Sequence, residues 1–526
     1  MHWWMQGRRI PSLCASLVLV LLTACGGGGS SSVPDPGPGL GGGGGGGTVG
    51  DGGGNGGGTP VGGTEINPPP GPPTAHVLDS LIMPTPQSAA APKEVAVASM
   101  AVRPKAINVA LPQWSDAPTV VMPMPGMPMQ IGAPRALSSL QSAGDLARTL
   151  RWTQTPDGGQ VAAISITSGG AHGLRLGLVV DSLPDSAQIR LYRKDRSQTG
   201  FETTGKAINE AIARNRRVDG DTQAASIWWT PDLGAEEVTL EIGLPAGVPS
   251  SQLRIAIPTL THAYANLALP MEVELRENYV PRNVGDAANC ELDASCADQY
   301  ATERNAVARM TYVGSDSRYY YCTGSLLNNT KLDYTPYFLS ANHCISTQAS
   351  ATSLRTDWFF RSASCNSFEP SAQTKALQRG ATLLYAAVAT DTTLMRLNEA
   401  APAGVTLAGW DARGTAVTGT AIYGLHHPQG DLLKYSEGQV QSYRNCSLNG
   451  GSLICDAGNA QSDFVNVGWS KGITEGGSSG SPIFVAGRVV GSLSGGSSSC
   501  TAKGSSDVYS RFDKTFGSQI GNWLAQ

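Results

Sequence analysis

The cysteines constrain the fold of this chain more than any other feature, because all but two of the ten fall in one region. An even set confined to one region indicates disulfide bonds and, with them, an oxidising compartment. Zinc binding is the alternative, but no CxxC or HxxxH spacing supports it. The eight cysteines of the set lie beyond residue 289: Cys290, Cys296, Cys322, Cys344, Cys365, Cys446, Cys455 and Cys500.

The N-terminus indicates export. Arg8 and Arg9 precede a short apolar stretch, "IPSLCASLVLVLLTA", as in a signal peptide. The stretch ends in "LTAC", which resembles a bacterial lipobox, so we expect residues 1–25 to be a lipoprotein-type signal peptide and Cys25 to carry lipid. An ordinary secretory signal that ends near a cysteine is the alternative. Acyl chains in one leaflet would hold the protein at the outer membrane or cell surface, or it would be released from there.

The next segment, residues 26–75, is dominated by Gly and then by Pro. Such a composition cannot bury enough apolar surface to fold. A Gly-rich coil of this length would extend roughly 40 Å root mean square. We therefore expect a disordered linker between the anchor and the folded part of the chain.

Residues 76–275 have an ordinary composition and read as a β-sandwich domain. Alternating runs such as "QVAAISIT", "HGLRLGLVV", "EVTLEIGL" and "QLRIAI" have the period of strands and are separated by turn residues. One helix is expected around "GKAINEAIARNRR". No motif in this domain points to chemistry.

A polar segment with Pro and Gly, residues 276–289, separates this domain from a second one at 285–526. The second domain contains all eight paired cysteines and many short strand-like runs. It ends in a predicted helix, because apolar residues recur there at helical spacing. These residues are Phe512, Phe516, Ile520 and Trp523.

Charge and hydropathy give no support to nucleic-acid binding or to a membrane-spanning helix. The formal net charge is −4 and no run of Lys or Arg occurs, so nothing favours nucleic acid. No apolar stretch of spanning length follows the N-terminus, so a transmembrane helix is not expected. We expect a monomer.

Three separate stretches of the second domain could carry chemistry. His343 follows an apolar strand in "YFLSANHC", and Asp391 begins one in "VATDTTLMRL". The third stretch is "TEGGSSGSPIF", in which glycines surround Ser478, Ser479 and Ser481. Repeated glycines let a backbone turn tightly with its N–H groups pointing inward, which suits an oxyanion hole. A plain linker would not run directly into the buried hairpin pattern "SPIFVAGRVVGSL".

Together these stretches resemble the chymotrypsin-like serine proteases, and most closely the bacterial lysyl endopeptidases. The resemblance covers about residues 285–526 and follows the order His, Asp, Ser of that superfamily. It implies an all-β fold with two β-barrels and a C-terminal helix. The matching motifs are "CTGSLLNN", "YFLSANHC", "TDTTLMRL", "GLHHPQG", "GGSSGSPIF" and "SSDVYSRF".

The resemblance assigns a role to each candidate. Ser479 is the nucleophile, His343 the general base and Asp391 the residue that orients the imidazole. The N–H groups of Gly477 and Ser479 form the oxyanion hole. Ser478 and Ser481 are then framework. No cofactor and no metal are implied.

The resemblance also implies the specificity pocket and the disulfides. Asp507 lies at the base of the pocket, where it pairs with a basic side chain, and Ser494 stands where lysyl enzymes carry a histidine. The matching tryptophan has no clear equivalent, and Tyr443 is the nearest candidate. The family pattern implies the bonds Cys290–Cys500, Cys296–Cys365 and Cys322–Cys344, which leaves Cys446 and Cys455 to pair with each other.

Three other residues invite a functional reading. His426 and His427 are adjacent, and adjacent residues on a strand point to opposite faces, so we expect structural roles rather than a shared metal. We expect Trp469 to belong to the core rather than to a substrate platform.

The expected function is an exported serine endopeptidase that acts on protein or peptide substrates at Lys, with Arg as a second target. The 76–275 domain would be a pro-region of the zymogen, and Arg276 and Arg282 would be self-cleavage sites. The alternative is a surface-anchored binding protein whose protease fold is inactive, which the intact His, Asp and Ser disfavour. In a third interpretation the sandwich is an adhesin and the protease its processing tool.

Overall fold

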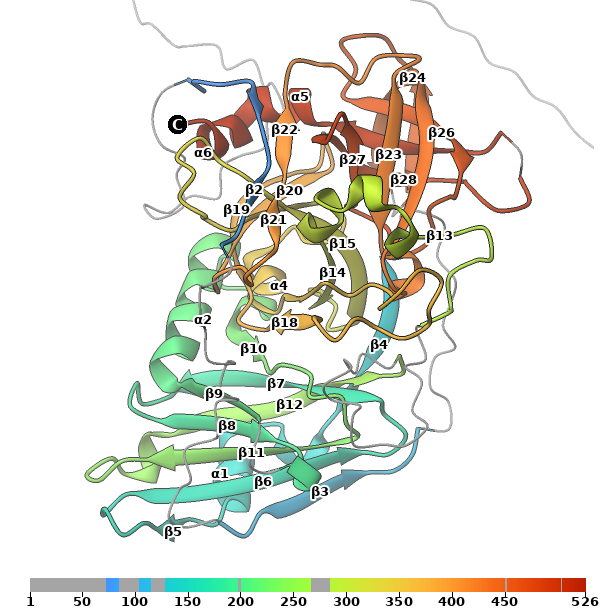
Figure 1. The fold of residues 1–526 in the computed structure, drawn as a ribbon. Coiled ribbons are helices and arrows are strands. Elements are labelled where there is room, and N and C mark those ends of the chain that lie inside the picture. Colours follow the sequence, from blue (N-terminus) through green and yellow to red (C-terminus); the bar gives the residue numbers. More distant parts are fainter. Residues whose placement is uncertain are drawn as a thin grey trace, which may run out of the picture. The chain divides into compact units, whose positions relative to one another are not determined.

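The computed structural model of the chain describes residues 72–84, 104–114, 128–196, 200–265, 284–449, 452–502 and 504–526. The expected signal peptide with Cys25, and the expected cleavage sites at Arg276 and Arg282, lie outside these residues. No helix within them is both long and apolar enough to cross a membrane. The fold is mostly β (Figure 1).

The described residues between 104 and 265 form a β-sandwich, as the alternating runs predict. Its strands are β3 (Ile107–Leu111), β4 (Met129–Ala136), β5 (Thr153–Gln154), β6 (Gln160–Ser168), β7 (Gly173–Ser182), β8 (Gln188–Tyr192), β9 (Gly200–Thr204), β10 (Ile227–Trp229), β11 (Glu237–Leu244) and β12 (Arg254–Ala263). One sheet has the order β3-β6-β11-β8-β9, and the other begins β10-β7-β12-β4. Buried Leu, Ile and Val side chains from both sheets form one core.

Two helices accompany the sandwich, and both begin at capping residues. α1 (Ala143–Thr149) starts at Ser142, whose side chain forms a capping box with Asp145. The predicted helix is α2 (Gly205–Asp219), which starts at Thr204 and ends at a glycine with positive φ.

Residues 284–526 resemble the proteases and are called the protease region below. The first of its two barrels is a curved half-barrel. Its strands are β14 (Val307–Val313), β15 (Tyr319–Leu327), β16 (Tyr337–Ser340), β17 (Arg355–Trp358), β18 (Lys375–Leu377), β19 (Ala381–Ala387) and β20 (Thr392–Leu397). They pair in the path β18-β17-β14-β15-β16-β20-β19, which does not close among the described residues.

The second barrel closes completely. Its strands are β23 (Ala421–His426), β24 (Lys434–Asn449), β26 (Phe464–Lys471), β27 (Pro482–Val485), β28 (Arg488–Gly496) and β29 (Ser506–Arg511). Each strand pairs with two others in the ring β23-β24-β26-β29-β28-β27. Two barrels of this kind make the chymotrypsin-like fold that the motifs predict. Four short strands accompany the barrels: β13 (Leu292–Asp293), β21 (Thr406–Leu407), β22 (Gly409–Asp411) and β25 (Ser452–Ala457).

The predicted C-terminal helix is present but interrupted. α5 (Phe512–Thr515) and α6 (Gly521–Leu524) are separated by a π-helical turn at Phe516–Ile520. A π turn takes more residues than an α turn, so it rotates the last residues around the axis. Leu524 is therefore buried in the core. Trp523, which the sequence places on the apolar face of the helix, is only half-buried.

The sandwich is joined directly to the half-barrel. β4 pairs with β12 of the sandwich along one part of its length and with β15 along another, so one sheet runs through both. The Asp219 carboxylate at the end of α2 also accepts the first free N–H groups of α4 (Gln348–Thr352), at 2.9 and 2.8 Å.

The sandwich domain is expected to begin at residue 76, and the described residues around that position contact the protease region. Residues 72–84 do not pair with the sandwich: β1 (Val77–Leu78) pairs with β22 and β2 (Leu81–Ile82) with β21, both in the protease region (Figure 1). A two-residue strand offers too little sequence pattern to reveal its partner.

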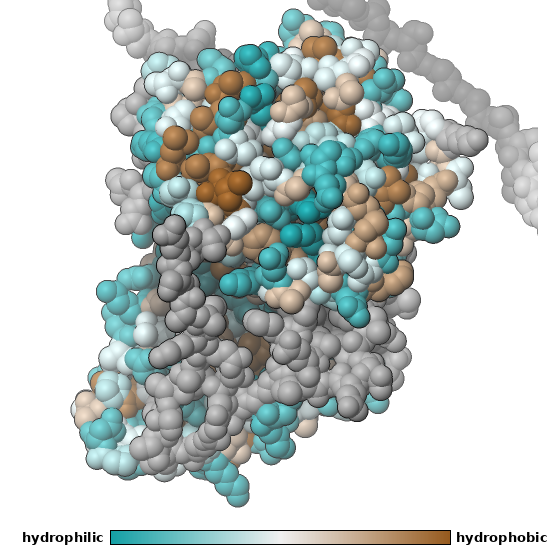
Figure 2. All heavy atoms as spheres, in the orientation of Figure 1, coloured by the Kyte–Doolittle hydropathy of each residue, from teal (hydrophilic) through white to brown (hydrophobic). Residues whose placement is uncertain are grey.

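On the face drawn in Figure 2, hydrophobic side chains form small separate groups among hydrophilic ones.

Candidate active site

His343 and Asp391 meet because their strands are neighbours. β16 pairs with β20, with Ser340 opposite Thr393, so the turn after one strand lies beside the residue before the other. The His343 Nδ1–H donates to Asp391 Oδ2 at 2.8 Å, and the backbone N–H of His343 donates to Oδ1 at 2.9 Å. Because the carboxylate can only accept, Nε2 is the ring atom left free to take a proton.

Asp391 is held in a costly conformation. Its φ is +46°, a left-handed value that non-glycine residues seldom adopt, and its carboxylate is wholly buried. The hydrogen bond from the Asn342 N–H to the Asp391 carbonyl, at 3.1 Å, helps to fix this turn. Backbone strain of this kind commonly gathers where side chains must be aimed.

The loop at Ser479 is tied to the half-barrel. The Thr323 N–H of β15 donates to the Ser479 carbonyl at 2.8 Å, and the Thr323 hydroxyl donates to the Gly477 carbonyl at 3.0 Å. Gly480 has a φ of +80°, and a Cβ there would lie 2.2 Å from Ser340 Oγ. Only glycine fits, and the loop therefore rests against the strand end that leads to His343.

Ser479 and His343 are close to this junction but are not hydrogen-bonded to each other. Ser479 Oγ and His343 Nε2 are both buried, and neither has a hydrogen-bond partner among the described residues. Hydrogen bonds between catalytic groups are often long without substrate and shorten in the complex. The N–H groups of Gly477 and Ser479 likewise donate to no described residue.

Ser478 has a different environment. Its hydroxyl lies 2.9 Å from His426 Nδ1 and accepts the Glu475 N–H. On the other side of the ring, Ser436 donates to the Ile473 carbonyl, so its oxygen must accept from His426 Nε2–H. His426 Nδ1 therefore accepts from the Ser478 hydroxyl, which is no longer free to react.

His426 and His427 contact different partners. His427 Nδ1 donates to the Asp431 carbonyl at 2.9 Å, whereas His426 Nδ1 contacts Ser478. Burial lowers the pKa of both imidazoles to about 3. Within the described ranges, no three His, Cys, Asp or Glu side chains gather in a way that could hold a metal.

Asp507 lies on β29 and is completely buried. Its Oδ2 accepts from Trp469 Nε1 at 2.6 Å, Thr474 Oγ1 at 2.7 Å and Ser498 Oγ at 2.6 Å. Burial raises the pKa of Asp507, and these hydrogen bonds act in the opposite direction. No described Lys or Arg forms an ion pair with Asp507.

The expected role of Trp469 as core alone is incomplete, because its indole also binds the Asp507 carboxylate. The register explains this: Val467 lies opposite Asp507, so Trp469, two residues on, points to the same face. Tyr443, the expected substitute, instead lies under the Arg511 guanidinium. Ser494 is fully buried at a register shift between β28 and β29, and its hydroxyl has no partner among the described residues.

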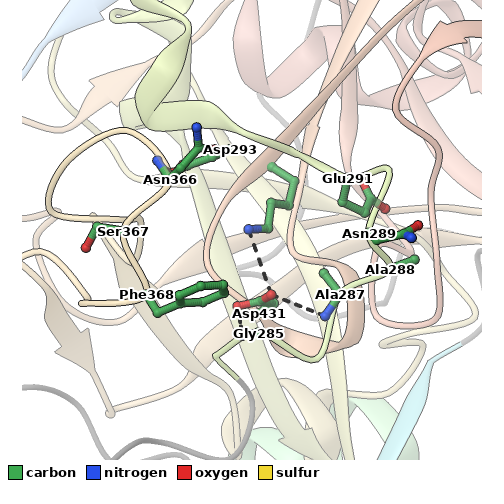
Figure 3. A pocket seen from close by; sticks show the side chains of 11 residues that line it. Gly285, Ala287, Ala288, Asn289, Glu291, Asp293, Asn366, Ser367, Phe368 and Asp431 are labelled. Carbon is green, nitrogen blue, oxygen red and sulfur yellow. Dashed lines mark hydrogen bonds and ion pairs between the residues drawn. The ribbon is translucent and has the colours of Figure 1, made fainter.

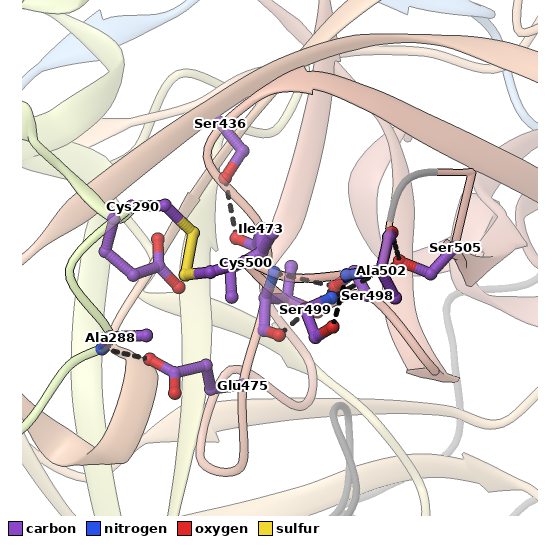
Figure 4. Close-up of a disulfide and its surroundings, with 12 residues drawn as sticks. Ala288, Cys290, Ser436, Ile473, Glu475, Ser498, Ser499, Cys500, Ala502 and Ser505 are labelled. Carbon is purple, nitrogen blue, oxygen red and sulfur yellow. Dashed lines mark hydrogen bonds between the residues drawn. A yellow bond between two sulfur atoms is a disulfide. The ribbon is translucent and has the colours of Figure 1, made fainter.

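Four disulfides join the cysteines that the structure describes. Cys290–Cys500 joins the start of the protease region to the loop that carries Ser498 (Figure 4). Cys322–Cys344 links β15 to the residue after His343, and Cys446–Cys455 spans paired positions of β24 and β25. The fourth bond is Cys296–Cys365.

An acidic group beside the site was not foreseen from the sequence. Asp431 accepts the N–H groups of Gly285 and Ala287 at 3.0 and 3.2 Å, in a cavity of about 310 Å³ (Figure 3). Glu291 lines the same cavity, 3.7 Å from His426, and burial holds the pKa of its carboxyl well above the usual range. These acids are scattered along the sequence, so no local motif marks them.

Comparison with known proteins agrees with this geometry. The model of the lysyl endopeptidase C-terminal domain matches residues 284–510, and that of the lysyl endopeptidase N-terminal domain matches residues 103–264. A lysyl endopeptidase of Pseudomonas aeruginosa is 32% identical over 422 residues, which cover 77% of this chain and 83% of that protein.

Two solved structures are also similar in part. The active form of the Rv3671c protease from M. tuberculosis is 13% identical with a TM-score of 0.30, over 48% of this chain and 95% of that one. The MamO protease domain from Magnetospirillum magneticum is 12% identical with a TM-score of 0.28, over 41% and 96%.

Proposed function

The chain belongs to the lysyl endopeptidase family and is a serine endopeptidase, and from this premise we propose that it cleaves peptide bonds after Lys and Arg through an acyl-enzyme. The observation that carries the proposal is Asp507, a wholly buried carboxylate with no described cationic partner. A buried charge is costly unless it is paired. A basic substrate side chain supplies the missing partner.

The proposed reaction uses the three residues near the junction of the barrels. Ser479 Oγ attacks the scissile carbonyl while its proton passes to His343 Nε2. The carboxylate of Asp391 stabilises the imidazolium, and the N–H groups of Gly477 and Ser479 stabilise the oxyanion. The proton then moves to the leaving amine, and water hydrolyses the acyl-enzyme by the same steps.

Acceptance of Arg is part of the proposal. Ser494 is small, and its unpartnered hydroxyl offers an acceptor to a second nitrogen of a guanidinium. Lys, with its compact ammonium, needs only the Asp507 carboxylate.

A peptide library tests this specificity. We expect cleavage by the mature enzyme almost entirely after Lys and Arg, read by mass spectrometry of the products. Cleavage after Lys alone would contradict the role of Ser494, and cleavage mainly after apolar or acidic residues would contradict the whole pocket assignment.

We further propose that the protein is exported as a lipid-anchored zymogen. Three observations support latency: Ser479 is buried, Pro128 lines the same cavity as His343, and β4 covers the edge of β15 next to the disulfide beside His343. A sheet edge is where an extended peptide adds, so β4 would compete with substrate.

Mass spectrometry of protein purified from membranes tests both parts. We expect one fragment that begins at a lipidated Cys25 and another that begins directly after Arg276 or Arg282. An unmodified Cys25 would contradict the anchor. A protease whose mature N-terminus lies at or before residue 76 would contradict removal of a pro-region.

A further inference from the structure

Residues 72–84, here called the strap, are built into the protease region. β1 is an added antiparallel strand on β22, with Val77 opposite Asp411 and Leu78 opposite Trp410. β2 pairs in the same way with β21, with Leu81 opposite Leu407. β21 and β22 form the connection between the half-barrel and the closed barrel, so the strap lies along that connection (Figure 1).

Backbone hydrogen bonds hold the strap from end to end. Near its start, the Thr74 N–H donates to the Ala525 carbonyl at 2.8 Å. Near its end, the Met83 N–H donates to Val405 at 2.8 Å and the Met83 carbonyl accepts from Gly404 at 3.1 Å. Ladder bonds of this kind bind added strands in many peptide complexes.

Side chains of the strap reach both barrels. Leu78 packs against the core that contains Trp410, and Leu81 packs against the half-barrel core. The Asp79 carboxylate forms an ion pair with Arg488 of β28. The backbone carbonyl of Asp79 accepts a hydrogen bond from Asn328 Nδ2 at 2.8 Å. The strap therefore bridges elements that lie far apart in sequence.

The receiving surface is shaped for the strap. A Cβ on Gly409 would lie 2.4 Å from the Leu78 carbonyl, so the strap approaches where no other side chain fits. The Gly409 N–H is also satisfied by the strap, through Ser80 Oγ at 2.9 Å. None of the strap's hydrogen bonds or ion pairs to described residues goes to the sandwich.

We propose that the strap is a permanent noncovalent part of the protease domain, which stays bound when the chain is cut between residue 84 and the sandwich. Loss of the sandwich would then leave the preceding Gly-rich segment attached to the enzyme. One consequence rests on the proposed function: if Cys25 carries lipid, the mature protease remains anchored without a covalent link.

The test uses the full chain with Ser479→Ala, so that no result depends on its own proteolysis. A recognition site for a sequence-specific protease replaces residues between 84 and 104, and an affinity tag is placed in the Gly-rich segment. After complete cutting, checked on a denaturing gel, the tag is captured. We expect the remainder of the chain to be captured in equal amount. Capture of the tagged piece alone would overturn the proposal.

Neighbouring residues supply a matched pair of variants. Leu81→Asp places a charge against the half-barrel core, and we expect the captured amount to fall at least tenfold. Ile82→Asp is the control, because Ile82 is 57% exposed, and we expect no change. Equal loss in both variants would contradict the register described above. Each uncut variant is first checked for cooperative thermal unfolding.

Because the inactive Ser479→Ala chain is used, the outcome is independent of the proposed peptidase specificity. A strap that dissociates would leave the assignment of Asp507 untouched. An enzyme with a different specificity would leave the strap result unchanged.

Discussion

Replacement of Ser479 by Ala is expected to lower kcat for a peptide ending in Lys by about 10⁶-fold. The substitution removes a hydroxyl that has no hydrogen-bond partner among the described residues, on the residue whose own N–H is unpaired like that of Gly477. Residual turnover would come from binding and the oxyanion hole alone. The measurement is steady-state hydrolysis of a chromogenic substrate by the mature enzyme.

The neighbouring serine is the control. Ser478→Ala removes a hydrogen bond to His426 but no reacting group. A hydrogen bond of this kind contributes about 1 kcal/mol, so we expect a loss of about tenfold or less. If Ser478→Ala inactivated the enzyme and Ser479→Ala did not, the assignment of the nucleophile would be wrong.

The second large effect is expected for Asp507→Asn. A substrate cation buried without its partner costs about 3–5 kcal/mol, so kcat/KM for Lys and Arg substrates should fall roughly 10³-fold. The amide keeps the shape of the carboxylate and can still accept from Thr474 and Ser498. A substrate with an uncharged residue at the same position is the control, and its kcat/KM should change little.

Acidification should act in the same direction. Burial raises the pKa of Asp507, and only the ionised carboxylate attracts a cation. Activity on basic substrates is therefore present above that pKa and is lost as the pH falls through it. Equal loss of kcat/KM for charged and uncharged substrates, in the variant or on acidification, would contradict the pocket assignment.

Local motifs predicted the parts of the site that lie on short stretches. "YFLSANHC" and "GGSSGSPIF" contain the residues that shape their own turns, so the turns that carry the candidates His343 and Ser479 could be predicted from sequence. The positive φ of Gly480 is a local requirement that a glycine-rich motif can reveal, whereas the atoms that exclude a Cβ there, such as Ser340 Oγ, belong to the half-barrel.

Long-range register could not be predicted. Trp469 reaches Asp507 only because β26 and β29 align Val467 with that carboxylate, and no property of "NVGWSKG" fixes this alignment. The pairing of the strap could not be predicted for the same reason, since its partners β21 and β22 come more than three hundred residues later. The π turn was missed because its apolar spacing matches an α-helix.

The shared strand β4 has a kinetic consequence. Only Met129, Gln130 and Gly132 are in register with β15, whereas Gly132 to Ala136 are in register with β12. The strands of so short a ladder can separate one residue pair at a time, starting at Met129. If the chain is the zymogen proposed above, scission of the connection after β12 would let this ladder open, and the rate of opening would set the delay before the enzyme becomes active.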